Sequence, residues 1–286
     1  MKRKFITAHI ALIAALIVCS VAYTNGQKIK VALKFISFNI RQSGLPGQDG
    51  NNKWDNRKGA TIKLIEQEAP AVFGLQEALL EQVRYIEKNL PQYTRFGVGR
   101  DDGENAGEFM AVFYLSDEFN LLRSGTFWLS ETPDSVSKGW DAGCFRTVTW
   151  VLLQDKKSKK EFYYFNTHFD NQGAAARENS AKLVAKRIKD ITTKKASIIL
   201  GGDFNSSMSD PIFNPLKKYM NVVRECSPVT DNKGTFNGFG STPNNIVLDH
   251  FFCKNVTCKL FKTLDGNYGA PYISDHYPIE FVCELK

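Results

Sequence analysis

The sequence lacks the signatures of several common protein classes. It has no glycine/serine-rich or proline-rich linker, no internal repeat and no low-complexity tract, so we expect the 286-residue chain to carry one large domain. It has no G-x-S-x-G motif and no cysteine beside a plausible base, which disfavours a serine or cysteine nucleophile. A P-loop is also missing, which disfavours an activity driven by nucleoside triphosphate hydrolysis.

The first 26 residues have the pattern of an export signal. A basic segment at residues 2–4 precedes an apolar run at residues 10–18 that is too short to span a bilayer comfortably. Small residues at −3 and −1 favour cleavage before Gln27. Lipid attachment at Cys19 is the alternative, although the residue before it is not small. We therefore expect residues 1–26 to be removed from an exported protein, periplasmic or secreted, whose domain is residues 27–286.

The mature chain is only mildly basic and poor in cysteine. Without the leader, 34 basic residues face 30 acidic ones, which suits a polyanionic substrate but not a polybasic nucleic-acid binder. The remaining cysteines are odd in number and show no C-x-x-C or Cys/His zinc spacing. Export permits a disulfide, but a domain of this size does not need one. We expect buried free thiols at Cys144, Cys226, Cys253, Cys258 and Cys283.

Hydrophobic periodicity predicts many strands with a few helices between them. Strands are predicted at residues 30–39, 71–75, 93–98, 109–115, 125–129, 145–154, 161–167, within 196–205, and at 246–253, 256–262 and 277–284. Helices are predicted at residues 54–68, 79–89, 173–190 and 210–219. This order favours two packed sheets with helices outside.

The stretch A-S-I-I-L-G-G-D-F-N at 196–205 is the most informative segment. A buried strand stops at two glycines, and Asp203 and Asn205 follow with side chains pointing the same way. An acid beside an amide suits a phosphate, a metal or an attacking water. A lone D-x-N is more often an ordinary turn.

Five further strand ends carry similar polar residues, which makes turn chemistry an insufficient explanation. The strand-end residues are Asn39, Glu77, His168 with Asp170, Asp203 with Asn205, Asp249 with His250, and Asp275 with His276. Collected on one rim, they provide an oxygen-rich cation site and two imidazoles. Oxygen ligands without cysteine indicate Mg²⁺ or Mn²⁺ and a site that hydrolyses phosphate esters.

These motifs, in order, resemble the endonuclease/exonuclease/phosphatase superfamily, which includes deoxyribonuclease I. The matching segments are S-F-N (37–39), Q-E (76–77), N-T-H-F-D (166–170), G-G-D-F-N (201–205), L-D-H-F-F (248–252) and S-D-H-Y-P (274–278). The resemblance implies a four-layer α/β sandwich with the site at one end of the paired sheets. Residues 125–134 and 138–143 resemble a bacterial branch near the deadenylase-like members.

The resemblance implies a role for each strand-end residue. Glu77 would be the principal metal ligand, with Asn39 and Asp275 nearby. Asp203 would position or deprotonate the attacking water, and Asn205 would hold that water or a phosphate oxygen.

Two histidines would lie beside the phosphate, each with an acid behind it. His276 would be oriented by Asp249, and His168 by Glu108. His250 should point away, because its neighbour Asp249 points inward.

Further residues are assigned to the substrate side of the site. Arg146 would clamp a phosphate, with a surface salt bridge as the alternative. Asp170 and Asn237 are candidate wall residues. Trp128 and Trp140 would either stack on a base or sugar ring or pack beneath a loop.

Two hypotheses remain open from the sequence. The first is an exported, monomeric, Mg²⁺- or Mn²⁺-dependent phosphoester hydrolase acting on a nucleic acid, nucleotide, sugar phosphate or lipid head group. The absence of an apolar hairpin and of a basic wedge argues against sphingomyelin and duplex DNA. The second is a non-catalytic surface or binding protein that retains the fold.

Overall fold

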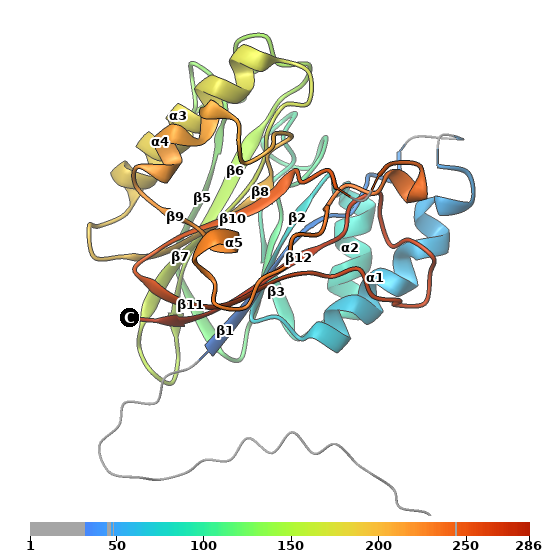
Figure 1. Ribbon diagram of the computed structural model, residues 1–286, viewed down its shortest axis with the longest axis horizontal. Helices are drawn as coiled ribbons and strands as arrows, with labels where there is room; N and C mark the ends of the chain where they lie inside the picture. The colour runs from blue at the N-terminus through green and yellow to red at the C-terminus, as the bar shows by residue number, and fades with distance from the viewer. Residues whose placement is uncertain (1–31, 45–46, 48, 244) are drawn as a thin grey trace, which may run out of the picture.

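The computed structural model describes residues 32–44, 47, 49–243 and 245–286 (Figure 1). The predicted leader, the cleavage site before Gln27 and the lipid-attachment alternative at Cys19 therefore lie outside the described residues. Among the helices of the described part, none is both long and apolar enough to cross a membrane.

The first sheet has six strands in the order β11-β12-β1-β2-β4-β3. Their bounds are β1 Ala32–Asn39, β2 Val72–Gln76, β3 Tyr93–Phe96, β4 Val112–Leu115, β11 Val256–Thr263 and β12 Ile279–Leu285. β1 runs parallel to β2 and antiparallel to β12. The carboxyl ends of β1 and β2 and the start of β12 therefore share one edge.

The second sheet repeats this arrangement in the order β5-β6-β7-β8-β10-β9. Its strands are β5 Phe119–Trp128, β6 Thr147–Asp155, β7 Glu161–His168, β8 Ser197–Asp203, β9 Asn221–Val222 and β10 Asp249–Lys254. β8 runs parallel to β7 and antiparallel to β10, with Asp249 opposite Asp203. The carboxyl ends of β7 and β8 thus meet the start of β10.

The longer helices and α4 cover the outer faces of the two sheets, whereas α5 lies at the edge of the inter-sheet core, as Figure 1 shows. The helices are α1 Trp54–Glu68, α2 Leu80–Asn89, α3 Ala174–Ile191, α4 Asn214–Lys217 and α5 Val223–Cys226, with 3₁₀ turns η1 Gly50–Asn52, η2 Pro211–Phe213 and η3 Gly238–Gly240. α1 and α2 pack on the first sheet, and α3 and α4 on the second. The predicted four-layer α/β sandwich is confirmed.

Strand alternation divides the core into three layers. In β1, Phe35 packs between the sheets, whereas Ile36 and Phe38 pack against the helices. In β8, Ile199 packs between the sheets and Leu200 against the helices. The residues that end β1 and β8 on the inter-sheet face are polar, so the inter-sheet core terminates in a polar site.

Several predicted elements differ from the structure. The predicted helix 210–219 is divided into η2 and α4, because Pro211 and Pro215 each start a helical turn and cannot continue one. The predicted strand 125–129 is part of the longer β5, which pairs with β6 across a bulge between Leu121 and Arg123. β9 and α5 were not predicted.

The prediction of buried thiols is only partly right. Cys253 and Cys283 are buried, Cys144 and Cys258 are half-buried, and Cys226 is exposed.

Candidate active site

A cavity of about 560 Å³ opens at the shared edge of the two sheets. Six of the strand-end residues line it: Glu77, His168, Asp203, Asn205, Asp275 and His276. Arg41, Arg100 and Arg146 also face it. The predicted rim of polar residues therefore exists, and it faces a space large enough for a small ligand.

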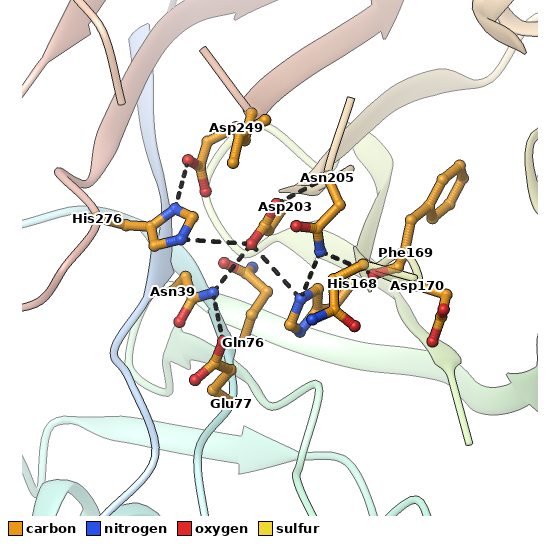
Figure 2. A network of polar contacts seen from close by, with 12 residues as sticks. Asn39, Gln76, Glu77, His168, Phe169, Asp170, Asp203, Asn205, Asp249 and His276 are labelled. Carbon is orange, nitrogen blue, oxygen red and sulfur yellow. Dashed lines mark hydrogen bonds and ion pairs between the residues drawn. The ribbon is translucent and has the colours of Figure 1, made fainter. Parts of the chain in front are cut away.

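Asp203 lies at the centre of the polar network in Figure 2. Asn39 Nδ2 donates to Asp203 Oδ2 at 2.9 Å and to Glu77 Oε1 at 3.0 Å. Asp203 Oδ1 accepts from the backbone N of Asn205 at 2.9 Å. Burial, partly offset by His276, raises the pKa of Asp203 to about 7. Asp203 is thus a buried carboxylate with the proton affinity of a useful base.

His276 forms a tight pair with Asp249. His276 Nδ1 lies 2.8 Å from Asp249 Oδ2, and His276 Nε2 lies 3.7 Å from Asp203 Oδ2 (Figure 2). Burial alone would lower the pKa of His276, but Asp249 and Asp203 outweigh it and raise the pKa to about 10. Thr235 Oγ1 accepts from the backbone N of Asp249 at 3.1 Å. His276 is therefore held as an imidazolium beside the carboxyl groups of Asp249 and Asp203.

His168 is placed differently. Its Nε2 accepts from Asn205 Nδ2 at 3.0 Å and lies 3.5 Å from Asp203 Oδ2. Burial, together with the positive charges of Arg146 and Arg100, lowers the pKa of His168 well below its usual value. His168 is thus a neutral imidazole, in contrast to His276.

The expected pairing of His168 with Glu108 is not made as a hydrogen bond. His168 Nδ1 lies 3.9 Å from Glu108 Oε2 and has no hydrogen-bond partner among the described residues. Glu108 Oε2 instead accepts from Arg100 Nη1 at 2.5 Å. Burial raises the pKa of Glu108 to about 7, against the opposing effect of Arg100.

The predicted metal-binding side of the cavity is rich in carboxylate oxygen. Glu77 Oε2 accepts from the backbone N of Gln42 at 3.2 Å, and Asp275 Oδ1 from Ser274 Oγ at 3.1 Å. Burial raises the pKa of Asp275, and the negative charge of Glu77 raises it further. The half-buried carboxylate of Glu77 and the buried carboxylate of Asp275 repel each other, and a hard cation with oxygen preference would relieve that repulsion. The donor set therefore fits Mg²⁺ or Mn²⁺.

A second group of potential metal ligands lies beside the carboxylates of Glu77 and Asp275. One ligand atom each from Asp203, Asp249 and His276 lies within 4.8 Å of the others. Since Asp249 already hydrogen-bonds the His276 ring, we assign these residues to proton transfer and phosphate contact.

Arg146 forms a buried ion pair with Asp170 in the cavity wall. Its Nε lies 3.2 Å from Asp170 Oδ2, and its Nη2 donates to Asn171 Oδ1 at 3.2 Å. Arg146 therefore does form a salt bridge, the alternative considered from the sequence, but its side chain is 6% exposed, so the salt bridge is buried and not on the surface. The role of Arg146 as a phosphate clamp stays a prediction. Asp170 also accepts from the backbone N of Gly143 and Gly173, so it anchors the wall.

Two further cavity arginines were missed by sequence reasoning. Arg41 Nη1 lies 3.7 Å from Asp275 Oδ2, and its Nη2 bonds Asp49 at 3.1 Å. Arg100 contacts Glu108 as described. Arg41 stands only two residues beyond Asn39, which is the signal that could have identified it.

Some candidates lie outside the cavity. Asn237 Oδ1 accepts from Phe239 N and its Nδ2 donates to Ser274 O, so it fixes loops, while its neighbour Phe236 lines the cavity. His250 bonds Ser206 O at 2.9 Å and points away, as predicted. Trp128 is buried and donates to Arg100 O at 2.8 Å, which matches the packing alternative. Trp140 is half-buried and does not line the cavity.

Arg57 supports the site from behind. This guanidinium is 1% exposed and donates to the carbonyls of Ile40, Arg41, Asn52 and Ile273. Burial lowers its pKa to about 10. It therefore joins the segment after Asn39 to the segment before Asp275.

Comparison with known proteins gives consistent matches. The model of the Endonuclease/Exonuclease/phosphatase family matches residues 36–276. A solved endonuclease/exonuclease/phosphatase from Bacteroides vulgatus is 34% identical, with a TM-score of 0.85, and the match covers 90% of this chain and 100% of that one. A mannosyl-6-phosphatase from Bacteroides thetaiotaomicron is 32% identical, with a TM-score of 0.83, covering 88% and 99%. An uncharacterised protein of Acanthamoeba polyphaga mimivirus is 27% identical over 251 residues, covering 81% of this chain and 92% of its own length.

Proposed function

Since the chain belongs to the Endonuclease/Exonuclease/phosphatase family, we propose that it is an exported, Mg²⁺- or Mn²⁺-dependent phosphoester hydrolase. The observation that carries this proposal is the network around Asp203. There a buried carboxylate, two imidazoles and two further carboxylates that could bind a metal converge on one cavity. A binding protein that had lost catalysis would have no reason to keep all of them.

The residues divide the work of hydrolysis between them. Glu77 and Asp275, with Asn39 beside them, would hold the cation, which supplies charge neutralisation at the phosphate when bound. Asp203, with its raised pKa, takes the proton of the attacking water. The amide oxygen of Asn205 would orient that water by accepting from it, because both hydrogens of Asn205 Nδ2 are already donated within the protein.

The two histidines act in different protonation states. His276, charged through Asp249, donates a hydrogen bond or a proton to a phosphate oxygen as negative charge develops there. His168 is neutral, and its Nε2 accepts a hydrogen bond from Asn205 Nδ2, so it would act by holding the Asn205 amide in place at the cavity. The cavity arginines add positive charge that attracts the anionic group.

A phosphomonoester of a sugar is the first substrate class to test. The similarity to a mannosyl-6-phosphatase at 32% identity supports it. The cavity volume of about 560 Å³ also suits a small phosphorylated molecule. A phosphodiester, such as a nucleic acid, is the competing class within the same chemistry.

A substrate panel tests this proposal. Purified mature protein, supplied with Mg²⁺ or Mn²⁺, is assayed on mannose 6-phosphate, other sugar phosphates, nucleotides, inositol phosphates, plasmid DNA, RNA and choline phospholipids. We expect phosphate release from sugar phosphates and little cleavage of duplex DNA. No turnover on any phosphoester, at metal concentrations that saturate binding, would favour the non-catalytic alternative.

Export is proposed from the leader alone. Cell fractionation of the full-length chain tests it, with a truncated chain starting at Gln27 as the control. Retention of both chains in the cytoplasm would contradict export.

A further inference from the structure

Three cysteines from separate elements meet at the edge of the inter-sheet core. Cys226 ends α5, Cys253 lies in β10, and Cys258 lies in β11. The Sγ atoms of Cys226 and Cys258 are 2.8 Å apart, and those of Cys253 and Cys258 are 3.4 Å apart. Cys283 lies opposite Cys258 in the β11–β12 register. None of these thiols belongs to the catalytic cavity.

We propose that Cys226 and Cys258 are a disulfide-forming pair, oxidised by thiol–disulfide exchange with a disulfide-bearing oxidant. Cys253 then remains as a neighbouring thiol. This proposal does not depend on the hydrolytic function, and its test needs no substrate.

The distances favour a disulfide over a metal site. Sulfur ligands on one tetrahedral Zn²⁺ lie about 3.8 Å apart, given Zn–S bonds of about 2.3 Å. The 2.8 Å separation of Cys226 and Cys258 is much shorter than that. A disulfide bond is about 2.05 Å long, so the two sulfurs need to approach by less than about 1 Å.

The pair also meets the chemical needs of exchange. Cys226 is exposed, so an oxidant can reach it, whereas Cys253 is buried. The thiols of Cys253 and Cys258 lower the pKa of Cys226, which favours the thiolate that acts as nucleophile.

Exchange proceeds in two balanced steps. The Cys226 thiolate attacks the external disulfide, forms a mixed disulfide and releases one external thiol. The Cys258 thiolate then attacks the Cys226 sulfur and releases the second external thiol. Two protein thiols are oxidised to one disulfide, and one external disulfide is reduced to two thiols.

The bond would connect the open edges of the two sheets. α5 directly follows β9, which is the edge strand of the second sheet, and β11 is the edge strand of the first. The chain between the two cysteines includes Phe236, in the cavity wall, and Asp249, the partner of His276. Closing this loop restricts the unfolded chain and so stabilises the fold.

The tryptic map of the chain makes the test direct, because each of these cysteines falls on its own peptide. Cys226 lies in residues 225–233, Cys253 in 234–254, Cys258 in 255–259 and Cys283 in 263–286. The mature protein is incubated with oxidised glutathione, alkylated under denaturing conditions, digested and analysed by mass spectrometry. We expect peptide 225–233 joined to peptide 255–259. Free alkylated thiols at all positions, or peptide 234–254 joined to 255–259, would overturn the assignment.

Thermal melts provide a second readout. Oxidation should raise the melting temperature by on the order of 5–10 °C, and dithiothreitol should reverse this. Cys226→Ser and Cys258→Ser should abolish the shift, whereas the control Cys144→Ser should retain it. If one equivalent of Zn²⁺ protected the three thiols and no disulfide formed under oxidant, the cluster would be a metal site and the proposal would be wrong.

Discussion

His276 Nδ1 lies 2.8 Å from Asp249 Oδ2, and the two residues belong to different sheets. His276 precedes β12 of the first sheet, and Asp249 begins β10 of the second. Their pairing therefore depends on the packing of the sandwich and couples the charge of the imidazole to the fold.

This coupling predicts non-additive mutants. His276→Ala should lower turnover by roughly two to four orders of magnitude, and Asp249→Asn by roughly 10- to 100-fold. The double mutant should be little slower than His276→Ala alone, because the acid acts through the ring. Turnover is measured for the four proteins with the best substrate of the panel. Losses that multiply would show that Asp249 has an independent, structural role.

The structure supports a functional pairing of Glu108 with His168 less strongly than that of Asp249 with His276. The two side chains are 3.9 Å apart, and Arg100 holds the carboxylate. If Glu108 orients His168 during turnover, Glu108→Gln and His168→Ala should also be non-additive. Independent losses in the same double-mutant cycle would leave Glu108 as the partner of Arg100 only.

Metal affinity should depend on Glu77 and not on His276. Glu77→Gln removes a carboxylate charge from the cation site, so Mg²⁺ binding should weaken at least tenfold and excess metal should partly restore turnover. His276→Ala should leave the affinity nearly unchanged. Titration calorimetry with Mn²⁺ measures both, and Glu178→Gln, an exposed change on α3, is the control. The reverse pattern would mean that the ligand and catalytic assignments are exchanged.

Arg57 should be one of the most sensitive structural positions. Arg57→Met leaves four carbonyl groups without their donor, so the free energy of unfolding should fall by roughly 3 kcal/mol or more. Metal affinity should also fall, because the segments beside Asn39 and Asp275 lose their link. Denaturant unfolding tests this, with the exposed Arg84→Met on α2 as the control. Equal stability of the two variants would rule out the supporting role.

Asp170 should stabilise the fold in a pH-dependent way. Although burial opposes it, donation from the backbone N of Gly173, Gln172 and Gly143 and the charge of Arg146 lower the pKa of Asp170 to about 2. Its unfolded value is about 3.9, so the stabilisation is present above pH 4 and is lost as the pH falls toward 2.

Melting temperatures of the wild type and Asp170→Asn between pH 7 and pH 3 test this. The difference should be largest near neutral pH and should shrink below pH 4. Asp117→Asn, at an exposed position, should change the melting temperature little throughout. A difference between wild type and Asp170→Asn that does not vary with pH would assign Asp170 a packing role only.

The sequence predicts much of this site because strand alternation is local. In β1, Phe35 and Asn39 are four residues apart and share the inter-sheet face, as do Ile199 and Asp203 in β8. Polar residues at the last inward position of buried strands must therefore meet once the sheets pack.

Other features of the structure depend on tertiary contacts, which cannot be predicted from the hydrophobic periodicity of the sequence. Arg100 reaches Glu108 from a loop, and three cysteines with no recognisable spacing meet through α5, β10 and β11. The exposure of Cys226 likewise follows from the short α5, which has too little sequence pattern to be predicted.

The most direct test of the account is the dependence of phosphate release on added metal. Mature protein is treated with EDTA, dialysed free of metal and supplied with mannose 6-phosphate, and phosphate is followed before and after Mg²⁺ is added. We predict no release above the blank until Mg²⁺ is present. We then predict turnover that Asp203→Asn lowers by roughly two orders of magnitude or more. Full turnover by the metal-free protein, or undiminished turnover by Asp203→Asn, would contradict the proposed hydrolytic site.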